Sequence, residues 1–149
     1  MVNIFDVAIY ILDKIGGTTS AMKLHKLCYY SQAWSLVWDD AELFSNKIEA
    51  WAYGPVIPDL YSKHQGKFAV DKSHFINFIS KEHLSTSQKE TIDVVLKNYA
   101  DKSSQWLSDQ THSEIPWKEA RKGIPEYERS SQVITLEAMA CYYGALCEA

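Results

Sequence analysis

The chain has 149 residues, of which 46% are hydrophobic, 23% charged and 13% aromatic, and its formal net charge is -4. This length predicts a single domain over residues 1–149, and the apolar content excludes intrinsic disorder. The mild acidity argues against nucleic-acid binding, because that function needs clusters of Lys and Arg.

Hydropathy and cysteine content bear on the compartment. The longest apolar stretches fall far short of the roughly 18 residues that cross a bilayer. Residues 2–12 are apolar but have no basic flank and no cleavage site, so they do not resemble a signal peptide. The odd number of cysteines, 3, favours reduced thiols over a disulfide framework. We therefore expect a cytoplasmic protein without a membrane partner.

Helical periodicity predicts the first two helices. Residues 3–15 place their apolar side chains on one stripe, and Gly16-Gly17 ends the pattern. Residues 20–38 follow the N-cap candidates Thr18, Thr19 and Ser20 and are apolar around most of the helix. Such a helix is usually the central one. We expect its core residues to be Leu24, Leu27, Tyr29, Tyr30, Trp34 and Trp38.

The pattern changes near residue 43. Alternation over residues 48–53 predicts a short strand, paired with residues 42–44 in a small β-ribbon and ended by Gly54-Pro55. A short helix is expected from Pro58 to about Gly66, since proline suits a first helical turn.

The second half of the chain is predicted to be helical. Ser85 and Gln88 have the spacing of a capping box that opens an amphipathic helix. Further helices are expected to begin near Ser103, Pro116 and Thr135, and the last one places Tyr143 in the core. The predicted fold is mainly α (α+β with minor β): a compact single domain around a central apolar helix.

Sequence patterns that bind metals or phosphates are missing. The chain has no His-x3-His, no Cys-x2-Cys, no GxGxxG and no GxxxxGK[ST] pattern. Cys28 lies in the middle of a predicted helix, which suits a core residue better than a nucleophile. We predict no metal, no cofactor and no catalytic residue.

Two stretches combine aromatic and polar residues. Residues 49–55 place Trp, Tyr, Gly and Pro at a strand end, as either a packed turn or a platform of rings. In residues 111–117, Thr111 is a candidate helix cap and Glu114 complements a helix start. Arg121 is expected to pair with a carboxylate, for which Glu49 is one candidate. The alternative partners of Glu49 are the aromatic residues of the second helix.

Four blocks of the sequence together resemble the SocA-like antitoxin domain, also called the Panacea domain, a family that includes phage-associated GepA-type proteins. The blocks are residues 23–32, residues 48–56, residues 111–117 with Ala120-Arg121, and Tyr142-Tyr143. His25, Cys28 and Ser31 depart from the residues common in the family, without weakening the resemblance.

The resemblance implies a helical, non-enzymatic antitoxin in a toxin–antitoxin or prophage locus. Its partner would be a cognate protein toxin encoded by an adjacent gene, neutralised by direct contact. Trp, Tyr and Arg often dominate protein interfaces. The candidate partner-binding or family-motif residues are Glu49, Trp51, Tyr53, Gly54, Pro55, Tyr61, Thr111, His112, Glu114, Trp117 and Arg121.

Two alternatives stay open. The first is a protease adaptor that delivers a toxin or another target to a cytosolic AAA+ protease, as some family members are thought to do. The second is a small hydrolase that uses His112, Glu114 and Arg121, with Tyr53 as a possible fourth residue. An enzyme would require these side chains to converge at an open cleft.

Overall fold

The structure, a computed structural model, describes residues 1–148 of the chain. In the order of the chain its elements are α1 (Ile4–Lys14), β1 (Thr18–Ser20), α2 (Ala21–Trp38), β2 (Glu49–Trp51), β3 (Gly54–Val56), α3 (Pro58–Tyr61), β4 (Ala69–Asp71), the 3-10 turns η1 (Lys72–His74) and η2 (Ile76–Phe78), α4 (Thr86–Tyr99), α5 (Ser104–Ser113), α6 (Ile115–Ala120) and α7 (Leu136–Glu148). The predicted class, mainly helical with minor β structure, is confirmed.

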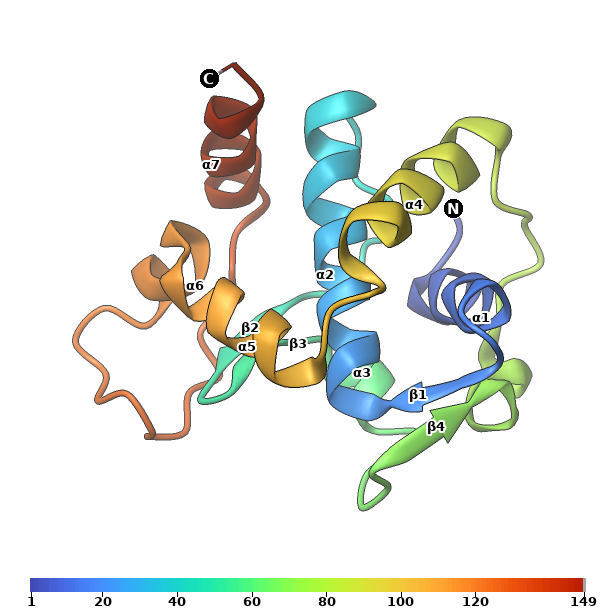
Figure 1. The fold of residues 1–149 in the computed structure, drawn as a ribbon, viewed down its shortest axis with the longest axis horizontal. Coiled ribbons are helices and arrows are strands. Elements are labelled where there is room, and N and C mark those ends of the chain that lie inside the picture. Colours follow the sequence, from blue (N-terminus) through green and yellow to red (C-terminus); the bar gives the residue numbers. More distant parts are fainter. Residues whose placement is uncertain (149) are drawn as a thin grey trace.

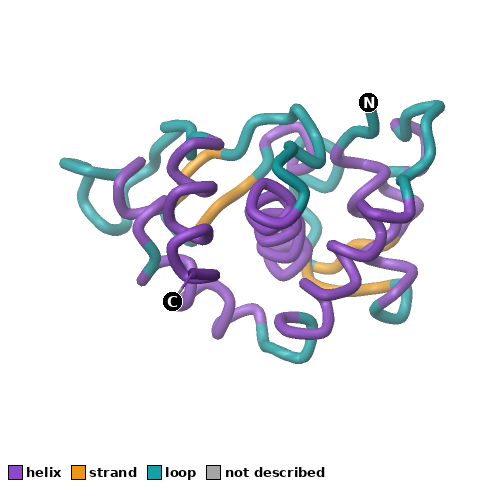
Figure 2. The backbone as a smooth tube through the Cα atoms, turned by 90° about the horizontal axis from the view of Figure 1, so that it is seen from above, coloured by secondary structure: helices purple, strands orange, loops and turns teal. Residues whose placement is uncertain are grey.

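Helix α2 is the centre of the fold. It runs vertically through the middle of Figure 1, with α7 on one side and α4 and α1 on the other. Figure 2 looks along α2 and shows the other elements arranged around it. Helix α2 contacts α1, α4, α5, α7, β1 and β3. The prediction of a central helix from its all-round apolar sequence is therefore confirmed.

The core packs side chains of α1, α2, α4 and α7 together with residues of the segments between them. Leu24, Leu27, Tyr30 and Tyr143 are fully buried, whereas Trp34 is partly exposed. The expectation that Trp38 lies in the core is wrong, since this residue is 41% exposed. Trp38 is the last residue of α2, and its ring stacks on Trp34 at a centroid distance of 4.9 Å.

Local capping signals set the starts of the long helices. Ser20 accepts a hydrogen bond from the Lys23 backbone N–H, which caps α2. Ser85 and Gln88 form the predicted capping box of α4. At the end of α1, Gly17 has φ +94°, a conformation that glycine adopts without strain.

The strand pairing differs from the prediction. The expected ribbon between residues 48–53 and 42–44 is wrong: β2 pairs antiparallel with β3, with Glu49 opposite Val56 and Trp51 opposite Gly54. Gly54, at φ +124°, begins the returning strand instead of ending the first one. A second sheet joins β1 to β4, although residues 18–20 carry only a helix-cap signal. Helix α3 ends at Tyr61, earlier than expected.

Candidate functional site

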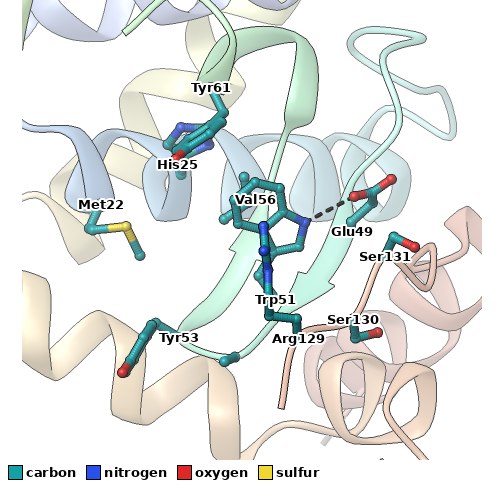
Figure 3. Close-up of a pocket in the computed structure, with 11 residues that line it drawn as sticks. Met22, His25, Glu49, Trp51, Tyr53, Val56, Tyr61, Arg129, Ser130 and Ser131 are labelled. Atoms are coloured by element: carbon teal, nitrogen blue, oxygen red, sulfur yellow. Dashed lines mark hydrogen bonds between the residues drawn. The ribbon is translucent and has the colours of Figure 1, made fainter. Parts of the chain in front are cut away.

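The β2–β3 hairpin forms one wall of a cavity of about 550 Å³. The first turns of α2 contribute Met22 and His25, α3 contributes Tyr61, and residues 129–131 close the remaining side (Figure 3). Segments from four parts of the chain therefore build this cavity, which is a common arrangement for binding sites.

Trp51 divides the cavity into two regions. In Figure 3, Met22, Tyr53 and Tyr61 lie on one side of the Trp51 ring, and Glu49 lies on the other with Ser130 and Ser131. The Trp51 and Tyr61 rings meet edge to face at 4.9 Å, a favourable aromatic geometry. Tyr53, at the turn of the hairpin, is 63% exposed. The cavity thus has an aromatic side and a polar side.

Glu49 is the acidic group that lines the cavity. Its side chain is 8% exposed, and Lys47 Nζ lies 3.2 Å from Oε2. Trp51 Nε1 donates to Oε1 at 2.9 Å. Glu49 also forms a β-bridge with Val133, which brings residues 129–131 to the cavity. The predicted ion pair between Glu49 and Arg121 is wrong.

A pair of buried histidines lies behind the aromatic side. His25 Nδ1 accepts from the Ile57 backbone N–H at 3.1 Å, so Nε2 carries the proton of the neutral ring. That proton is donated to His64 Nε2, 2.8 Å away. Burial holds the pKa of His25 well below its ordinary value, with further lowering by Lys26 and His64. His25 therefore contributes no charge to the cavity at neutral pH.

Arg121 lies beneath the hairpin and is 4% exposed. Its Nη1 donates to the Ala50 carbonyl at 3.1 Å, and its Nη2 donates to three carbonyls of the following loop, those of Pro125 (2.8 Å), Glu126 (3.1 Å) and Glu128 (2.6 Å). The guanidinium also lies 5.2 Å from the Trp117 ring centroid. The expected carboxylate partner is therefore wrong. Arg121 joins the hairpin to the loop that leads to the cavity residues 129–131.

The hairpin is also held from α5 and α6. Trp117 Nε1 donates to the Trp51 carbonyl at 2.8 Å, and His112 stacks on Trp117 at 4.1 Å. Thr111 donates to the Leu107 and Ser108 carbonyls inside α5, so its expected role as a helix cap is wrong. Burial lowers the pKa of His112, and Lys26 lowers it further.

Gly54 and Lys26 lie in close contact. An added Cβ at Gly54 would lie 2.6 Å from Lys26 Cε and 3.2 Å from Thr111 Oγ1, which leaves no room for a side chain. Lys26 Nζ is buried and has no hydrogen-bond partner within the described part of the chain. Pro55, the next residue of β3, is buried opposite Ala50. Lys26 and Thr111 therefore pack against the inner face of β3 at Gly54.

Glu114 belongs to a separate buried cluster. Its Oε1 accepts from Tyr30 Oη at 2.8 Å and from Tyr143 Oη at 2.7 Å, and its Oε2 accepts from Gln110 at 3.2 Å. Burial raises the pKa of Glu114, and these hydrogen bonds partly offset that effect. Glu114 links α5, α2 and α7 and does not contact Arg121.

The replacement Glu114→Ala is expected to lower the free energy of unfolding by about 3 kcal/mol, because the buried hydroxyls of Tyr30 and Tyr143 lose their acceptor. Urea denaturation followed by circular dichroism measures the change. The matched control is Glu137→Ala on the exposed face of α7, for which a change within about 0.5 kcal/mol is expected. Equal effects of the two variants would contradict this role of Glu114.

The predicted site residues thus separate into two groups. Glu49, Trp51, Tyr53 and Tyr61 line the cavity, whereas Gly54, Pro55, Thr111, His112, Glu114, Trp117 and Arg121 lie outside its lining. The three residues of the hydrolase alternative do not converge: His112 stacks on Trp117, Glu114 binds tyrosines, and Arg121 binds carbonyls.

Sequence reasoning missed several cavity residues. Met22 and His25 lie one helical turn apart, so the predicted helix over residues 20–38 places them on one face. Arg129, Ser130 and Ser131 follow an irregular loop and reach the cavity through the bridge between Glu49 and Val133. No periodic pattern in the sequence predicts that bridge.

Within residues 1–148, no group of three or more His, Cys, Asp or Glu side chains is placed to hold a metal ion. None of the described helices combines the length and the apolar character needed to span a bilayer.

The chain was compared with known proteins and families. No curated protein and no solved structure matches it. The family model described as "Antitoxin SocA-like, Panacea domain" matches residues 24–118, more than half of the chain. The match includes the hairpin, most of α2 and the segment with Thr111 and Trp117, whereas Arg121 and Tyr142-Tyr143 lie beyond it. The chain therefore belongs to the SocA-like antitoxin family, which is defined by the Panacea domain.

Proposed function

We propose that this protein is a cytoplasmic antitoxin that neutralises a cognate protein toxin by direct contact, without a catalytic step. Membership of an antitoxin family carries the proposal. The toxin is expected to be the product of an adjacent gene, in a toxin–antitoxin or prophage locus.

The contact surface that we propose is the rim of the cavity together with residues 125–128 of the loop that leads to its lining residues 129–131. Tyr53 is 63% exposed on the hairpin turn, and Tyr127 is 71% exposed on the loop that Arg121 holds. Aromatic side chains bring large contact areas with few rotatable bonds, and they are enriched among the residues that dominate binding energy. Hydrogen bonds from Trp117 and Arg121 hold the two segments that carry these rings. This order reduces the conformational entropy lost on binding.

Co-expression with the product of the neighbouring gene tests the function. We expect the neighbour to stop growth when expressed alone, and growth to return when this chain is co-expressed and bound. A neighbour that is harmless alone, or that stays toxic and unbound, would contradict the proposal. The toxin level, followed by immunoblot, separates neutralisation from protease delivery: it stays constant under neutralisation and falls if the protein acts as an adaptor.

The surface is tested by removing one exposed ring at a time. Tyr53→Ala is expected to weaken toxin binding by about tenfold or more in calorimetry, because it removes a ring at the rim. The matched control is Phe68→Ala: Phe68 is 82% exposed and lies next to β4 instead of at the cavity. Equal losses of toxin affinity in the two variants would contradict the proposal that the toxin binds at the cavity rim.

A further inference from the structure

We propose that the cavity receives an aromatic side chain of the partner protein that carries a hydrogen-bond donor, a tyrosine or a tryptophan, with the ring beside Trp51 and the donor on Glu49. This inference rests on the proposed function and adds the chemistry of the group that is recognised.

The walls of the cavity favour a ring. Trp51, Tyr53 and Tyr61 present aromatic surfaces, and Trp51 and Tyr61 already meet edge to face. A further ring adds favourable aromatic contacts of the same kind. Met22 contributes a thioether, which packs well against aromatic edges. Arg129 is exposed at the rim, where a guanidinium stacks on an aromatic face. An aliphatic side chain would use fewer of these contacts.

The polar side of the cavity favours a donor. A carboxylate offers about four lone-pair sites. Among the residues that the structure describes, only Trp51 and Lys47 approach the Glu49 carboxylate oxygens within bonding distance. Glu49 therefore keeps acceptor capacity inside a cavity that is largely apolar. A phenol O–H or an indole N–H satisfies it, whereas a phenyl ring leaves it without a partner.

The charge balance favours a neutral occupant over a cation. Lys47 compensates the charge of Glu49 at 3.2 Å, and Arg129 adds a second positive charge at the rim. His25, which also lines the cavity, is neutral at physiological pH. A lysine or arginine side chain would therefore meet no uncompensated negative charge. The volume of about 550 Å³ exceeds that of one aromatic side chain and leaves room for the backbone next to it.

The test uses four amino-acid amides as probes: N-acetyl-tyrosinamide, N-acetyl-tryptophanamide, N-acetyl-phenylalaninamide and N-acetyl-argininamide. Each is titrated into the ¹⁵N-labelled protein while the Trp51 indole N–H and the backbone amides of residues 49–56 are followed by NMR. We expect saturable shifts with the tyrosine and tryptophan probes, and affinity about tenfold weaker for phenylalanine because one hydrogen bond to a charged group is lost. Arginine is expected to bind more weakly than tyrosine.

The variant Glu49→Gln supplies the specific control. When the amide oxygen accepts from Trp51, the NH2 group takes the place of Oε2, the oxygen beside Lys47. The site then loses its carboxylate acceptor, so the preference for tyrosine over phenylalanine is expected to disappear. The matched control Glu128→Gln removes one negative charge from the exposed loop outside the cavity lining and is expected to keep the preference. If Glu49→Gln does not fold, the affinities of the tyrosine and phenylalanine probes for the unaltered protein still test whether the site prefers a ring with a donor.

Several results would overturn the inference: equal affinities for the tyrosine and phenylalanine probes, tighter binding of arginine, or no saturable shift around Trp51 with any aromatic probe. These results are separate from the fate of the proposed function. If the protein neutralises the toxin but the probes do not bind as expected, the proposed function is supported and the proposed binding site is contradicted. If the probes bind as expected but the protein neutralises no toxin, the proposed function is contradicted and the proposed binding site is supported.

Discussion

The replacement Arg121→Met is expected to lower the free energy of unfolding by about 3 kcal/mol. The buried guanidinium donates to four backbone carbonyls, those of Ala50, Pro125, Glu126 and Glu128. Methionine fills much of the space but donates no hydrogen bond, so these carbonyls lose a charged donor, and the Ala50 carbonyl has no access to replacement water. Urea denaturation of the wild type and the variant measures the change.

Two further variants separate the role of geometry from that of charge. Arg121→Lys keeps the positive charge but lacks the planar fork of donors, so it is expected to recover less than half of the loss. Arg129→Met removes an exposed arginine at the cavity rim and is expected to change stability by less than about 0.5 kcal/mol. Full recovery with lysine would show that charge alone matters, which would contradict the proposed network.

Arg121 also connects stability with the candidate site. The loop that it binds continues into Arg129, Ser130 and Ser131, which line the cavity. Through Ala50 the same guanidinium holds β2, which carries Glu49 and Trp51. Arg121→Met is therefore expected to weaken toxin binding as well as folding, although Arg121 does not line the cavity.

The helices were predictable because their signals are local. Ser20, and Ser85 with Gln88, cap helices at the predicted positions. The all-round apolar pattern of residues 20–38 identified the central helix. Trp38 was misplaced because periodicity does not show where neighbouring helices stop covering a helix end. That information lies in the tertiary structure.

The site was only partly predictable, because its geometry depends on contacts between distant segments. Trp51, Tyr53 and Tyr61 stood out as rings near a turn, and the structure places all three at one cavity. The roles of Glu49 and Arg121 were mistaken, since opposite charges suggested an ion pair. In the structure Glu49 binds Trp51 of its own strand and Lys47 just before that strand. Arg121 binds backbone carbonyls, and no sequence pattern shows which carbonyls are free to accept from it.

Lys26 is the source of the second large expected effect, a rise in stability with pH. Its ammonium group is buried without a hydrogen-bond partner among the described residues, and burial lowers the pKa of Lys26 from 10.5 to about 7. Between these values the unfolded chain binds a proton that the folded protein does not, so stability increases with pH. We expect a slope that approaches about 1.4 kcal/mol per pH unit between pH 7 and 9, reduced toward pH 9 because burial raises the pKa of the Cys28 thiol. Urea denaturation at several pH values measures this slope.

The variant Lys26→Met tests this origin of the slope. Methionine has a similar length and no charge to desolvate, so the variant is expected to be more stable than the wild type by on the order of 3 kcal/mol at pH 6, with a flat profile from pH 7 to 8. Lys89→Met, on the exposed face of α4, is expected to keep the wild-type slope. Above about pH 10 the profile is expected to turn downward, because burial raises the pKa of Tyr29, Tyr30 and Tyr143 and the unfolded chain then releases protons that the folded protein keeps. A wild-type slope in Lys26→Met would contradict the assignment, because the titrating group would then be another residue.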